Sequence, residues 1–422
     1  MARAMKDSGI PWIGEIPDKW KLVRGKFLFR ERIERGNKIS LQLLTPSQKY
    51  GVVPQELYDE LSGMKSVKLD ESTDYNTLKS VYEGDFVISL RSFQGGFEYS
   101  KYDGVVSPAY HVFYRTSEIH NEYYRYMFKN SAFIEKMATL TKTFRDGKSI
   151  AYTDFADSII PVPPIDEQQR IAAFIDTECA RIDDIIEKTR ASIEEYKKLK
   201  QAVITEAVTK GIRLGRKMKD SGIEWIGEIP EEWEIIPHKI VMHKEKDICE
   251  HYNGENIISL SMYGVRVRDL DAGGKMPTTF DGYQYVEPEN MLLCLFDIDV
   301  TPRCVGIVND YGITSPAYSR FIVHEGFFNK YYDYLLRFID DKKVFVHLAK
   351  NLRSSLTETE FGTIKTLAPP YKEQKEIADY LDKKCSSIDF LIEQKTTLLS
   401  ELNTYKKSVI YEYVTGKKEV QI

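Results

Sequence analysis

Several segments bring basic side chains together with amides, hydroxyls and glycines, a mixture whose chemistry suits DNA. Arg and Gln pair with the major-groove edges of guanine and adenine, while Lys, Ser and Thr suit phosphates. Residues 21–38 carry seven basic and two acidic residues, within a chain whose formal net charge is −5. Further basic or amide-bearing loops occur around 91–96, 142–148, 266–275 and 350–353.

The residues expected to contact DNA share a loop or strand-end context and a basic, amide or hydroxyl side chain. They are Lys21, Arg24, Lys26, Arg30, Arg91, Ser92, Gln94, Lys142, Arg145, Lys148, Arg266, Arg268, Lys275, Arg303, Lys350, Asn351 and Arg353. A single cluster of this kind is as often a solvated surface as a binding site. Because the clusters recur in both halves of the chain, DNA binding is the better interpretation, and phosphate contacts predict a steep salt dependence.

Motifs that would indicate an enzyme are incomplete. Gly147-Lys148-Ser149 resembles the end of a phosphate-binding loop, but the glycine required upstream is replaced by Lys142. Ala368-Pro-Pro-Tyr371 resembles the loop with which amino-methyltransferases grip a base, but Ala368 stands where Asp, Asn or Ser is needed. We therefore expect no catalytic residues and no cofactor.

The cysteines and histidines predict neither disulfides nor a metal. Five cysteines stand apart, none in a CxxC pair, so a reduced, cytoplasmic protein is expected. Cys249 lies between His243 and His251, but this is not the spacing of a zinc site. The first residues lack the apolar segment of a secretory signal, and no apolar run is long enough to cross a membrane.

Length and composition leave room for several ordinary domains. The chain has 422 residues, of which 42% are hydrophobic and 29% charged, as in globular proteins. Self-comparison then reveals a duplication: residues 5–20 return as residues 218–233 with thirteen of sixteen positions identical. A period of about half the chain is a duplicated domain, because solenoid units repeat every ~20–50 residues.

Shorter repeats share this period. They are Ser107–Tyr110 with Ser315–Tyr318, the Pro-Pro-x-x-Glu-Gln of 163–168 with 369–374, Ile182-Asp183 with Ile388-Asp389, and Val203-Ile204 with Val409-Ile410. Between these anchors, residues 21–106 and 234–314 hardly match. Neutral drift would erode anchors and middle alike, so the pattern favours one scaffold with two readout surfaces.

The first ~160 residues of each half predict a mixed α/β domain. Strands are expected at 86–90, 109–114 and 291–296, and helical segments near 122–140 and 330–350. A long helix follows each domain. The first begins at Asp166, a good N-cap, and ends near Lys210, before Gly211.

Both long helices carry an apolar stripe in heptad spacing over four repeats. The apolar seam positions are Ile175, Ile182, Ile186, Ile193 and Val203 in the first helix, and Leu381, Ile388, Ile392, Leu399 and Val409 in the second. Each helix of about 45 residues is ~65 Å long and outruns any small domain. We therefore expect the two helices to pack on each other as an antiparallel coiled coil, in preference to each packing on its own domain.

Together the doubled anchors resemble the specificity subunits of Type I restriction–modification systems, over essentially the whole length. The resemblance rests on the doubled opening at 5–20 and 218–233, the doubled Ser-Pro-Ala-Tyr and Pro-Pro-x-x-Glu-Gln, and the helix ending Val-Ile-x-Glu-x-Val-Thr. It implies two target-recognition domains that each read one half of a split sequence in double-stranded DNA. It also implies two helices that bind two methyltransferase subunits, with restriction/translocase subunits joining through the complex.

The expected fold is α+β with an internal pseudo-twofold repeat. The expected segments are a first recognition domain at 1–164, a helix at 165–211, a second recognition domain at 212–370 and a helix at 371–422. Two other functions remain open from the residues alone: a stand-alone DNA-binding regulator, and a coiled-coil scaffold that binds only proteins.

Overall fold

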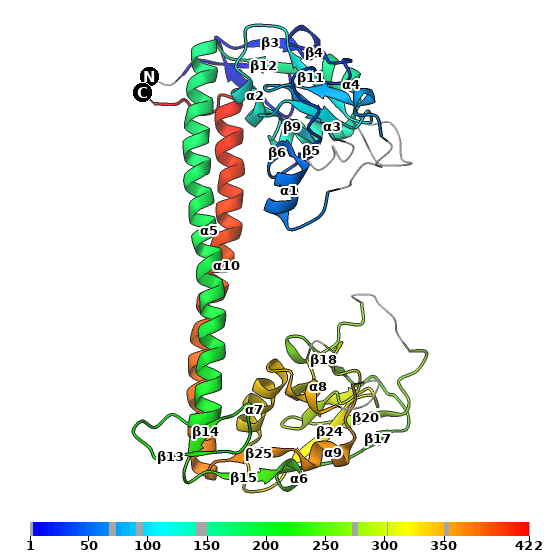
Figure 1. The fold of residues 1–422 in the computed structure, drawn as a ribbon, viewed down its shortest axis with the longest axis vertical. Coiled ribbons are helices and arrows are strands. Elements are labelled where there is room, and N and C mark those ends of the chain that lie inside the picture. Colours follow the sequence, from blue (N-terminus) through cyan, green and yellow to red (C-terminus); the bar gives the residue numbers. More distant parts are fainter. Residues whose placement is uncertain are drawn as a thin grey trace. The chain divides into compact units, whose positions relative to one another are not determined.

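The computed structural model describes residues 3–66, 73–89, 96–140, 150–271, 277–301, 303–349 and 354–421 (Figure 1). The chain divides into two compact units. Unit 1 contains Met1–Arg190 and Thr397–Ile422, and unit 2 contains Ala191–Thr396. Each unit thus holds one globular domain and part of each of two long helices. Within the described ranges, none of the helices has the length and apolar character that crossing a membrane requires.

The globular domain of unit 1 is mixed α/β, as predicted. Its strands are β1 (Met5–Asp7), β2 (Glu15–Pro17), β3 (Lys21–Arg24), β4 (Phe29–Glu31), β5 (Leu44–Ser47), β6 (Gly51–Pro54), β7 (Lys79–Val81), β8 (Phe86–Ile88), β9 (Phe97–Tyr99), β10 (Gly104–Val106), β11 (His111–Arg115) and β12 (Ile159–Val162). Its helices are α1 (Gln55–Ser62), α2 (Asn121–Met127), α3 (Ser131–Thr139) and α4 (Tyr152–Asp157). The central sheet is antiparallel, in the order β4-β11-β8-β9.

The globular domain of unit 2 is built on a similar sheet. Its strands are β13 (Met218–Asp220), β14 (Glu228–Pro230), β15 (Glu234–Pro237), β16 (Met242–Lys244), β17 (Ile248–Cys249), β18 (Ile257–Ser261), β19 (Gly264–Val267), β20 (Tyr283–Val286), β21 (Met291–Leu293), β22 (Val305–Ile307), β23 (Gly312–Thr314), β24 (Ser319–Val323) and β25 (Lys365–Ala368). Its helices are α6 (His238–Val241), α7 (Asn329–Asp341), α8 (Val344–Leu348) and α9 (Glu358–Thr363). The order β16-β24-β21-β22 parallels that of unit 1, and a second sheet runs β17-β20-β23-β18-β19.

The three predicted strands are confirmed as β8, β11 and β21, but each predicted helical segment is broken in two. In unit 1 the break lies between α2 and α3, where the Asn130 side chain accepts a hydrogen bond from the Ala132 amide and starts a new helix. In unit 2 the break lies between α7 and α8, where Lys343 adopts a left-handed conformation with φ 55°.

The two long helices are α5 (Ile165–Lys210, 46 residues) and α10 (Tyr371–Val414, 44 residues). The predicted end of α5 is confirmed, because Gly211 follows it with a positive φ of 75° that favours glycine. The predicted N-cap, Asp166, is wrong, because α5 already begins at Ile165. Asp166 therefore lies in the first turn of α5 and not at the N-cap. In the first turn its negative charge interacts favourably with the positive end of the helix dipole.

The predicted seam is the buried or half-buried stripe of both helices. Ile175, Ile182, Ile186 and Ile193 are no more than 7% exposed. Within unit 1, the Lys406 ammonium of α10 donates to both carboxylate oxygens of Asp183 on α5, at 2.7 and 2.6 Å. Within unit 2, Lys200 on α5 bonds Asp389 on α10 at the same two distances. The two ion pairs are equivalent under the sequence repeat, since each residue is shifted by 206.

The repeated glutamines join each globular domain to a long helix. In unit 1 the Gln168 amide donates to the Pro163 carbonyl and accepts from the His120 amide, both at 2.8 Å. Gln374 makes the corresponding pair of bonds in unit 2. Both side chains are fully buried, so losing either bond would leave a polar group without a partner.

Buried tyrosines make a second matched contact. The Tyr123 hydroxyl donates to the Val414 carbonyl at the end of α10 (2.7 Å), and the Tyr331 hydroxyl donates to the Val208 carbonyl near the end of α5 (3.1 Å). Residues near the ends of the sequence repeat thus connect each globular domain to a long helix, and both units make this connection with matching hydrogen bonds.

Candidate nucleic-acid interface

Ten of the predicted DNA-contacting residues lie outside the residues that the structure describes. They are Arg91, Ser92, Gln94, Lys142, Arg145, Lys148, Lys275, Lys350, Asn351 and Arg353. The seven that are described fall into two groups, one in each unit. These groups are Lys21, Arg24, Lys26 and Arg30 on and beside β3 and β4, and Arg266, Arg268 and Arg303 in unit 2.

In unit 1, Lys21 and Arg30 are exposed, whereas Lys26 is engaged within the domain. The Lys26 ammonium donates to the Asp157 carboxylate at 2.9 Å, and Arg24 lies 4.0 Å from the same carboxylate. Lys26 and then Arg24 lower the pKa of Asp157, which keeps its negative charge beside these cations. The positive charge of this surface is therefore smaller than the sequence count indicates.

Arg32 belongs to the same basic segment but has a structural role. Its guanidinium lies over the rings of Tyr82 and Tyr114, at 4.6 and 4.3 Å from their centroids. It also forms a bidentate pair with Asp85, at 2.7 and 2.9 Å. Burial raises the pKa of Asp85, and the Arg32 guanidinium opposes that rise.

In unit 2, Arg303 is held at the end of α7, where it pairs with Asp341 at 2.9 Å. Arg266 lies on β19 with its side chain exposed, and its guanidinium carbon is 4.9 Å from the Tyr263 ring centroid. Arg268 follows this strand, and its backbone amide donates to the Ile257 carbonyl at 2.7 Å. Arg266 and Arg268 are brought together by one hairpin, whereas Arg303 lies elsewhere in unit 2.

A cavity of about 600 Å³ in unit 1 lies between the globular domain and the two helices. Its wall includes Tyr50, Lys129, Cys179 and Lys406, together with Glu98 on β9. Glu98 is only 1% exposed, and the Lys129 ammonium lies 2.5 and 2.6 Å from its two oxygens. Burial raises the pKa of Glu98 to about 7, although Lys129 acts in the opposite direction.

This raised pKa predicts a measurable pH dependence. The ordinary pKa is 4.5, so between about 4.5 and 7 the folded protein binds more protons than the unfolded chain. The contribution of Glu98 to the free energy of unfolding therefore falls as the pH rises through that window, by about 1.4 kcal/mol per unit of pKa shift. Glu98→Gln should remove this dependence, which urea unfolding of both proteins from pH 4.5 to 8 would measure. The exposed Glu118→Gln is the control, and parallel wild-type and Glu98→Gln curves would contradict the assignment.

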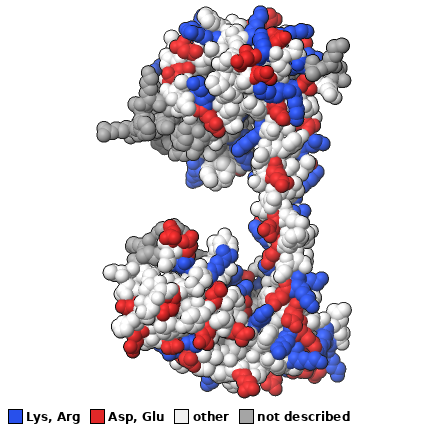
Figure 2. Space-filling model, turned by 180° about the vertical axis from the view of Figure 1, so that it is seen from behind, with Lys and Arg blue, Asp and Glu red and all other residues white. Residues whose placement is uncertain are grey.

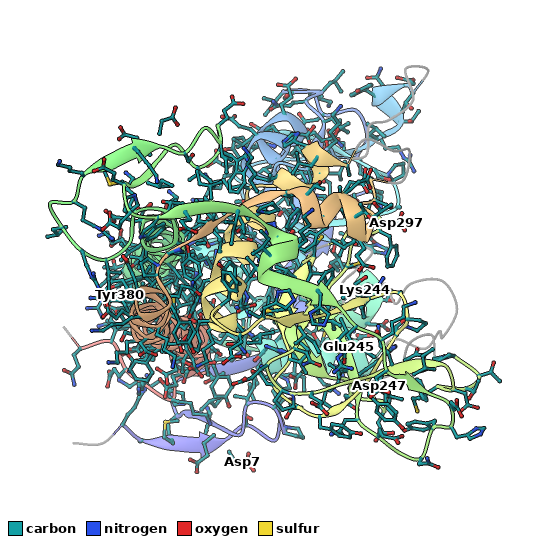
Figure 3. All side chains as sticks on the ribbon, turned by 90° about the horizontal axis from the view of Figure 1, so that it is seen from below. Asp7, Lys244, Glu245, Asp247, Asp297 and Tyr380 are labelled. Atoms are coloured by element: carbon teal, nitrogen blue, oxygen red, sulfur yellow. The ribbon has the colours of Figure 1, made fainter. Side chains whose placement is uncertain are left out.

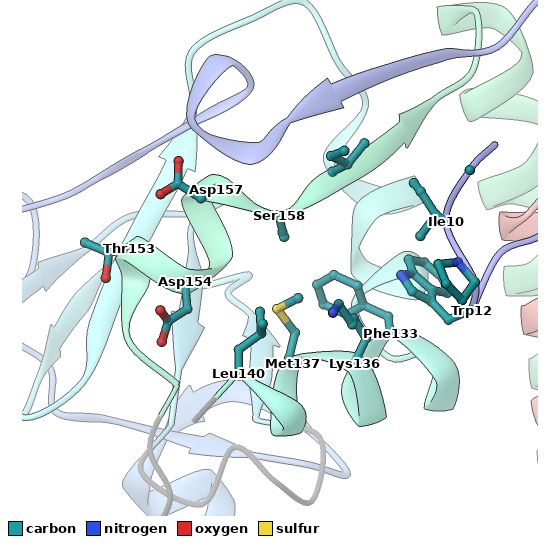
Figure 4. Close-up of a pocket in the computed structure, with 13 residues that line it drawn as sticks. Ile10, Trp12, Phe133, Lys136, Met137, Leu140, Thr153, Asp154, Asp157 and Ser158 are labelled. Atoms are coloured by element: carbon teal, nitrogen blue, oxygen red, sulfur yellow. The ribbon is translucent and has the colours of Figure 1, made fainter. Parts of the chain in front are cut away.

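A second cavity of about 600 Å³ lies under the opening repeat of unit 1 (Figure 4). Trp12, Phe133, Met137 and Leu140 give it an apolar wall, and Asp154 lies toward its rim. Trp12 and Phe133 are in edge-to-face contact, with ring centroids 5.8 Å apart. This is a packing surface between the opening repeat and α3.

The histidines of unit 2 form a contact that was not predicted. The Nδ1 atom of His243 on β16 lies 2.8 Å from Nε2 of His324, which follows β24. Lys244 and Glu245 follow His243 in the sequence, and in the view of Figure 3 they lie away from Tyr380 on α10. Among the described residues, which include His243, Cys249 and His251, no three His, Cys, Asp or Glu side chains converge as a metal site would require.

Comparison with known proteins shows which family these features resemble. The Type I restriction modification DNA specificity domain matches residues 17–195. The putative MjaX Type I restriction enzyme specificity subunit of Methanocaldococcus jannaschii is 26% identical over 292 residues, which span 65% of this chain and 62% of that protein. The MjaVIII specificity subunit from the same organism is 23% identical over 432 aligned residues, which span 96% of this chain and 94% of the relative. The chain is thus similar to Type I restriction enzyme specificity subunits, in one case over 96% of its length.

Solved structures agree with this family at the level of the fold. A chain from a structure of a type I restriction–modification system aligns with this protein at a TM-score of 0.69 and 14% identity, covering 96% of this chain and 99% of that chain. The HsdS subunit from Thermoanaerobacter tengcongensis aligns at 0.56 and 15%, covering 96% and 98%. In this family the specificity subunit is the DNA-recognition component and is not itself an enzyme.

Proposed function

We propose that this chain is a Type I restriction–modification specificity subunit that recognises a bipartite target in double-stranded DNA, with the globular domain of each unit reading one half. The observation that carries the proposal is the duplication itself. The joints between domain and helix recur bond for bond in units 1 and 2, while the sequences between the anchors differ. A shared scaffold with different loops is what two different half-sites require.

The long helices are the proposed spacer, packed as an antiparallel coiled coil with a pseudo-twofold repeat. Contacts within each unit support this arrangement. In unit 1, Phe174 on α5 contacts Tyr413 on α10, and Asp183 bonds Lys406, so the number falls on one helix as it rises on the other. The proposed segments are a recognition domain at 1–164, a helix at 165–211, a recognition domain at 212–370 and a helix at 371–422.

The outward faces of the helices are the proposed docking surface for two methyltransferase subunits, with restriction/translocase subunits joining through the complex. Helix α5 carries ten acidic and eight basic residues, and α10 carries eight acidic and seven basic residues. The helices thus hold three of the five net negative charges of the chain. Both signs are interspersed along them (Figure 2), which suits polar contacts with a protein. The proposed location is the cytoplasm, without a cofactor.

The proposed DNA contacts are the seventeen basic, amide and hydroxyl residues predicted above. Among the described ones, Lys21, Arg30 and Arg266 present exposed charge, whereas Lys26 and Arg303 are held by carboxylates of their own unit. Exposed cations are the ones that can exchange solvent counterions for phosphates.

A domain exchange tests the proposal. Residues 1–164 are replaced by those of another family member, and methylated bases are mapped in cells that also express the partner subunits. We expect one half of the methylated sequence to change and the other half to remain. Exchange of residues 212–370 is the matched control and should alter only the other half.

A change in both halves after either exchange would contradict independent recognition domains. Tight, selective DNA binding by the chain without methyltransferase subunits would favour the alternative of a stand-alone regulator. If neither the chain nor its complex bound duplex DNA selectively, the alternative of a protein-only scaffold would hold.

A further inference from the structure

Each unit contains a hairpin at the same place in its fold, although the two sequences were expected to share little there. In unit 1 the hairpin is β5–β6, and Leu43 just before it forms a parallel bridge with Val105 on β10. In unit 2 the hairpin is β18–β19, and Ile257 on it pairs in parallel with Ile313 on β23. Strands β10 and β23 both lead directly into the repeated Ser-Pro-Ala-Tyr, so the two hairpins are equivalent.

The tips of these hairpins carry the same three residues. Tyr50-Gly51-Val52 in unit 1 corresponds to Tyr263-Gly264-Val265 in unit 2. Gly51 and Gly264 have φ values of 76° and 101°, in the region where other residues are strained. Both valines are buried in a small cluster under the hairpin. The glycine and valine therefore shape and anchor the tip. Tyr263 is 71% exposed, whereas Tyr50 is half-buried and its hydroxyl donates to the Leu61 carbonyl at 2.9 Å.

A cation lies over each tyrosine ring. The Lys49 ammonium is 4.9 Å from the centroid of Tyr50, and the Arg266 guanidinium carbon is 4.9 Å from that of Tyr263. Both basic side chains are exposed, and no carboxylate among the described residues forms an ion pair with either. Residues 40–55 and 256–268 contain no Asp or Glu, in a chain with 64 of them. Each tip is thus a local positive surface.

A second basic residue stands behind each tip at equivalent positions. The Lys129 ammonium donates to the Gln48 carbonyl at 3.2 Å. In unit 2, Nη2 of Arg337 lies 3.8 Å from the point that a β-carbon on Gly264 would occupy. The combination of a tip cation and a tyrosine is therefore built twice, whereas the basic residue behind each tip is held by a carboxylate of its own unit, Lys129 by Glu98 and Arg337 by Asp333.

A feature that is the same in both units cannot distinguish two different half-sites. It must bind something that both halves of the target share, and every duplex presents the same phosphate backbone. We propose that the two hairpin tips are sequence-independent anchors, in which Lys49 and Arg266 bind DNA phosphates and the tyrosine rings hold these cations in place. This inference rests on the proposed DNA recognition and assigns its backbone contacts. The lack of acidic residues at the tips favours DNA over two copies of one protein partner.

The test measures duplex affinity of the complex with methyltransferase subunits, for cognate and unrelated DNA, over a range of salt concentrations. Lys49→Ala and Arg266→Ala should each weaken binding of both DNAs by a similar factor, roughly fivefold to tenfold. Each should also flatten the slope of log affinity against log salt concentration by about 0.9 for every phosphate that is no longer neutralised. The methylated sequence should be unchanged. Arg266→Lys should keep most of the affinity, and Lys239→Ala, which removes an exposed cation of α6, is the control.

Three outcomes would overturn the assignment. Relaxed specificity in one half-site after Arg266→Ala would make Arg266 a base reader. Unchanged affinity and salt slope with loss of methyltransferase subunits from the complex would make the tips a protein-binding surface. Unchanged affinity, salt slope and assembly would leave the tips without a binding role. A wild-type complex that does not select its duplex would instead refute the proposed function, which separates the two failures.

Discussion

Replacing Ile186 by Asp is expected to destabilise this protein by about 3–5 kcal/mol, because a buried carboxylate without a partner is among the most costly single changes. Ile186 is 7% exposed in the seam of α5. Lys406 and Lys200 already bind Asp183 and Asp389, so neither lysine is available to pair with the new carboxylate. The urea midpoint of the full chain and its recovery with methyltransferase subunits are the measurements. Ile392→Asp in α10 should act in the same direction, but less strongly, since Ile392 is only half-buried.

The adjacent residue provides a matched control. Ile185 is 37% exposed, so Ile185→Asp introduces the same charge one position away on a solvated face. Its cost should stay within about 1 kcal/mol. Equal effects of the two substitutions, or no effect of Ile186→Asp on melting and partner binding, would mean that the heptad stripe is not the surface on which the helices pack.

Removing one heptad from both helices is expected to change the spacing between the two half-sites, or to abolish binding at the original spacing. Deleting Thr189–Glu195 and Lys395–Glu401 keeps the apolar stripe in phase and shortens each helix by ~10 Å. Recognition of both half-sites on one face of the duplex places their centres about one helical turn, ~34 Å, apart. On the proposed arrangement the helices set this distance, and ~10 Å corresponds to about three base pairs.

Methylome mapping together with binding to duplexes of varied spacer length measures the result. The two half-site sequences should survive, since the globular domains are untouched. A variant with alanines at the exposed positions of the same heptads, but of unchanged length, should keep the original spacer. Retention of that spacer at full affinity by the shortened protein would refute the role of the helices as a ruler.

Much of the scaffold could be predicted because its signals are local. The heptad stripe predicted which positions of α5 and α10 are buried or half-buried, and Gly211 predicted the end of α5, since periodicity and helix-stop residues act within a few turns of chain. The breaks between α2 and α3 and between α7 and α8 were missed. Asn130 is an ordinary cap in hindsight, but nothing in the sequence signals the left-handed Lys343.

The candidate interface was less predictable, because the availability of a cation depends on partners far away in the sequence. Lys26 and Asp157 are separated by 131 residues, and Arg32 and Asp85 by 53. Counting charges along residues 21–38 gives a strongly basic segment, whereas folding pairs several of these charges inside unit 1. The raised pKa of Glu98 likewise comes from burial, to which residue type gives no guide.

The sequence by itself determined the duplication, the long helices and the family resemblance, because repeated strings and heptads are read directly from residue order. Only the tertiary structure decided that repeated residues connect each globular domain to a long helix, as the matching bonds of Gln168 and Gln374 show. The equivalence of the two Tyr-Gly-Val hairpins also needed the structure. Three matching residues within a divergent stretch are weak evidence by themselves. The structure shows that each hairpin pairs with the strand that precedes the repeated Ser-Pro-Ala-Tyr, and this pairing involves partners distant along the chain.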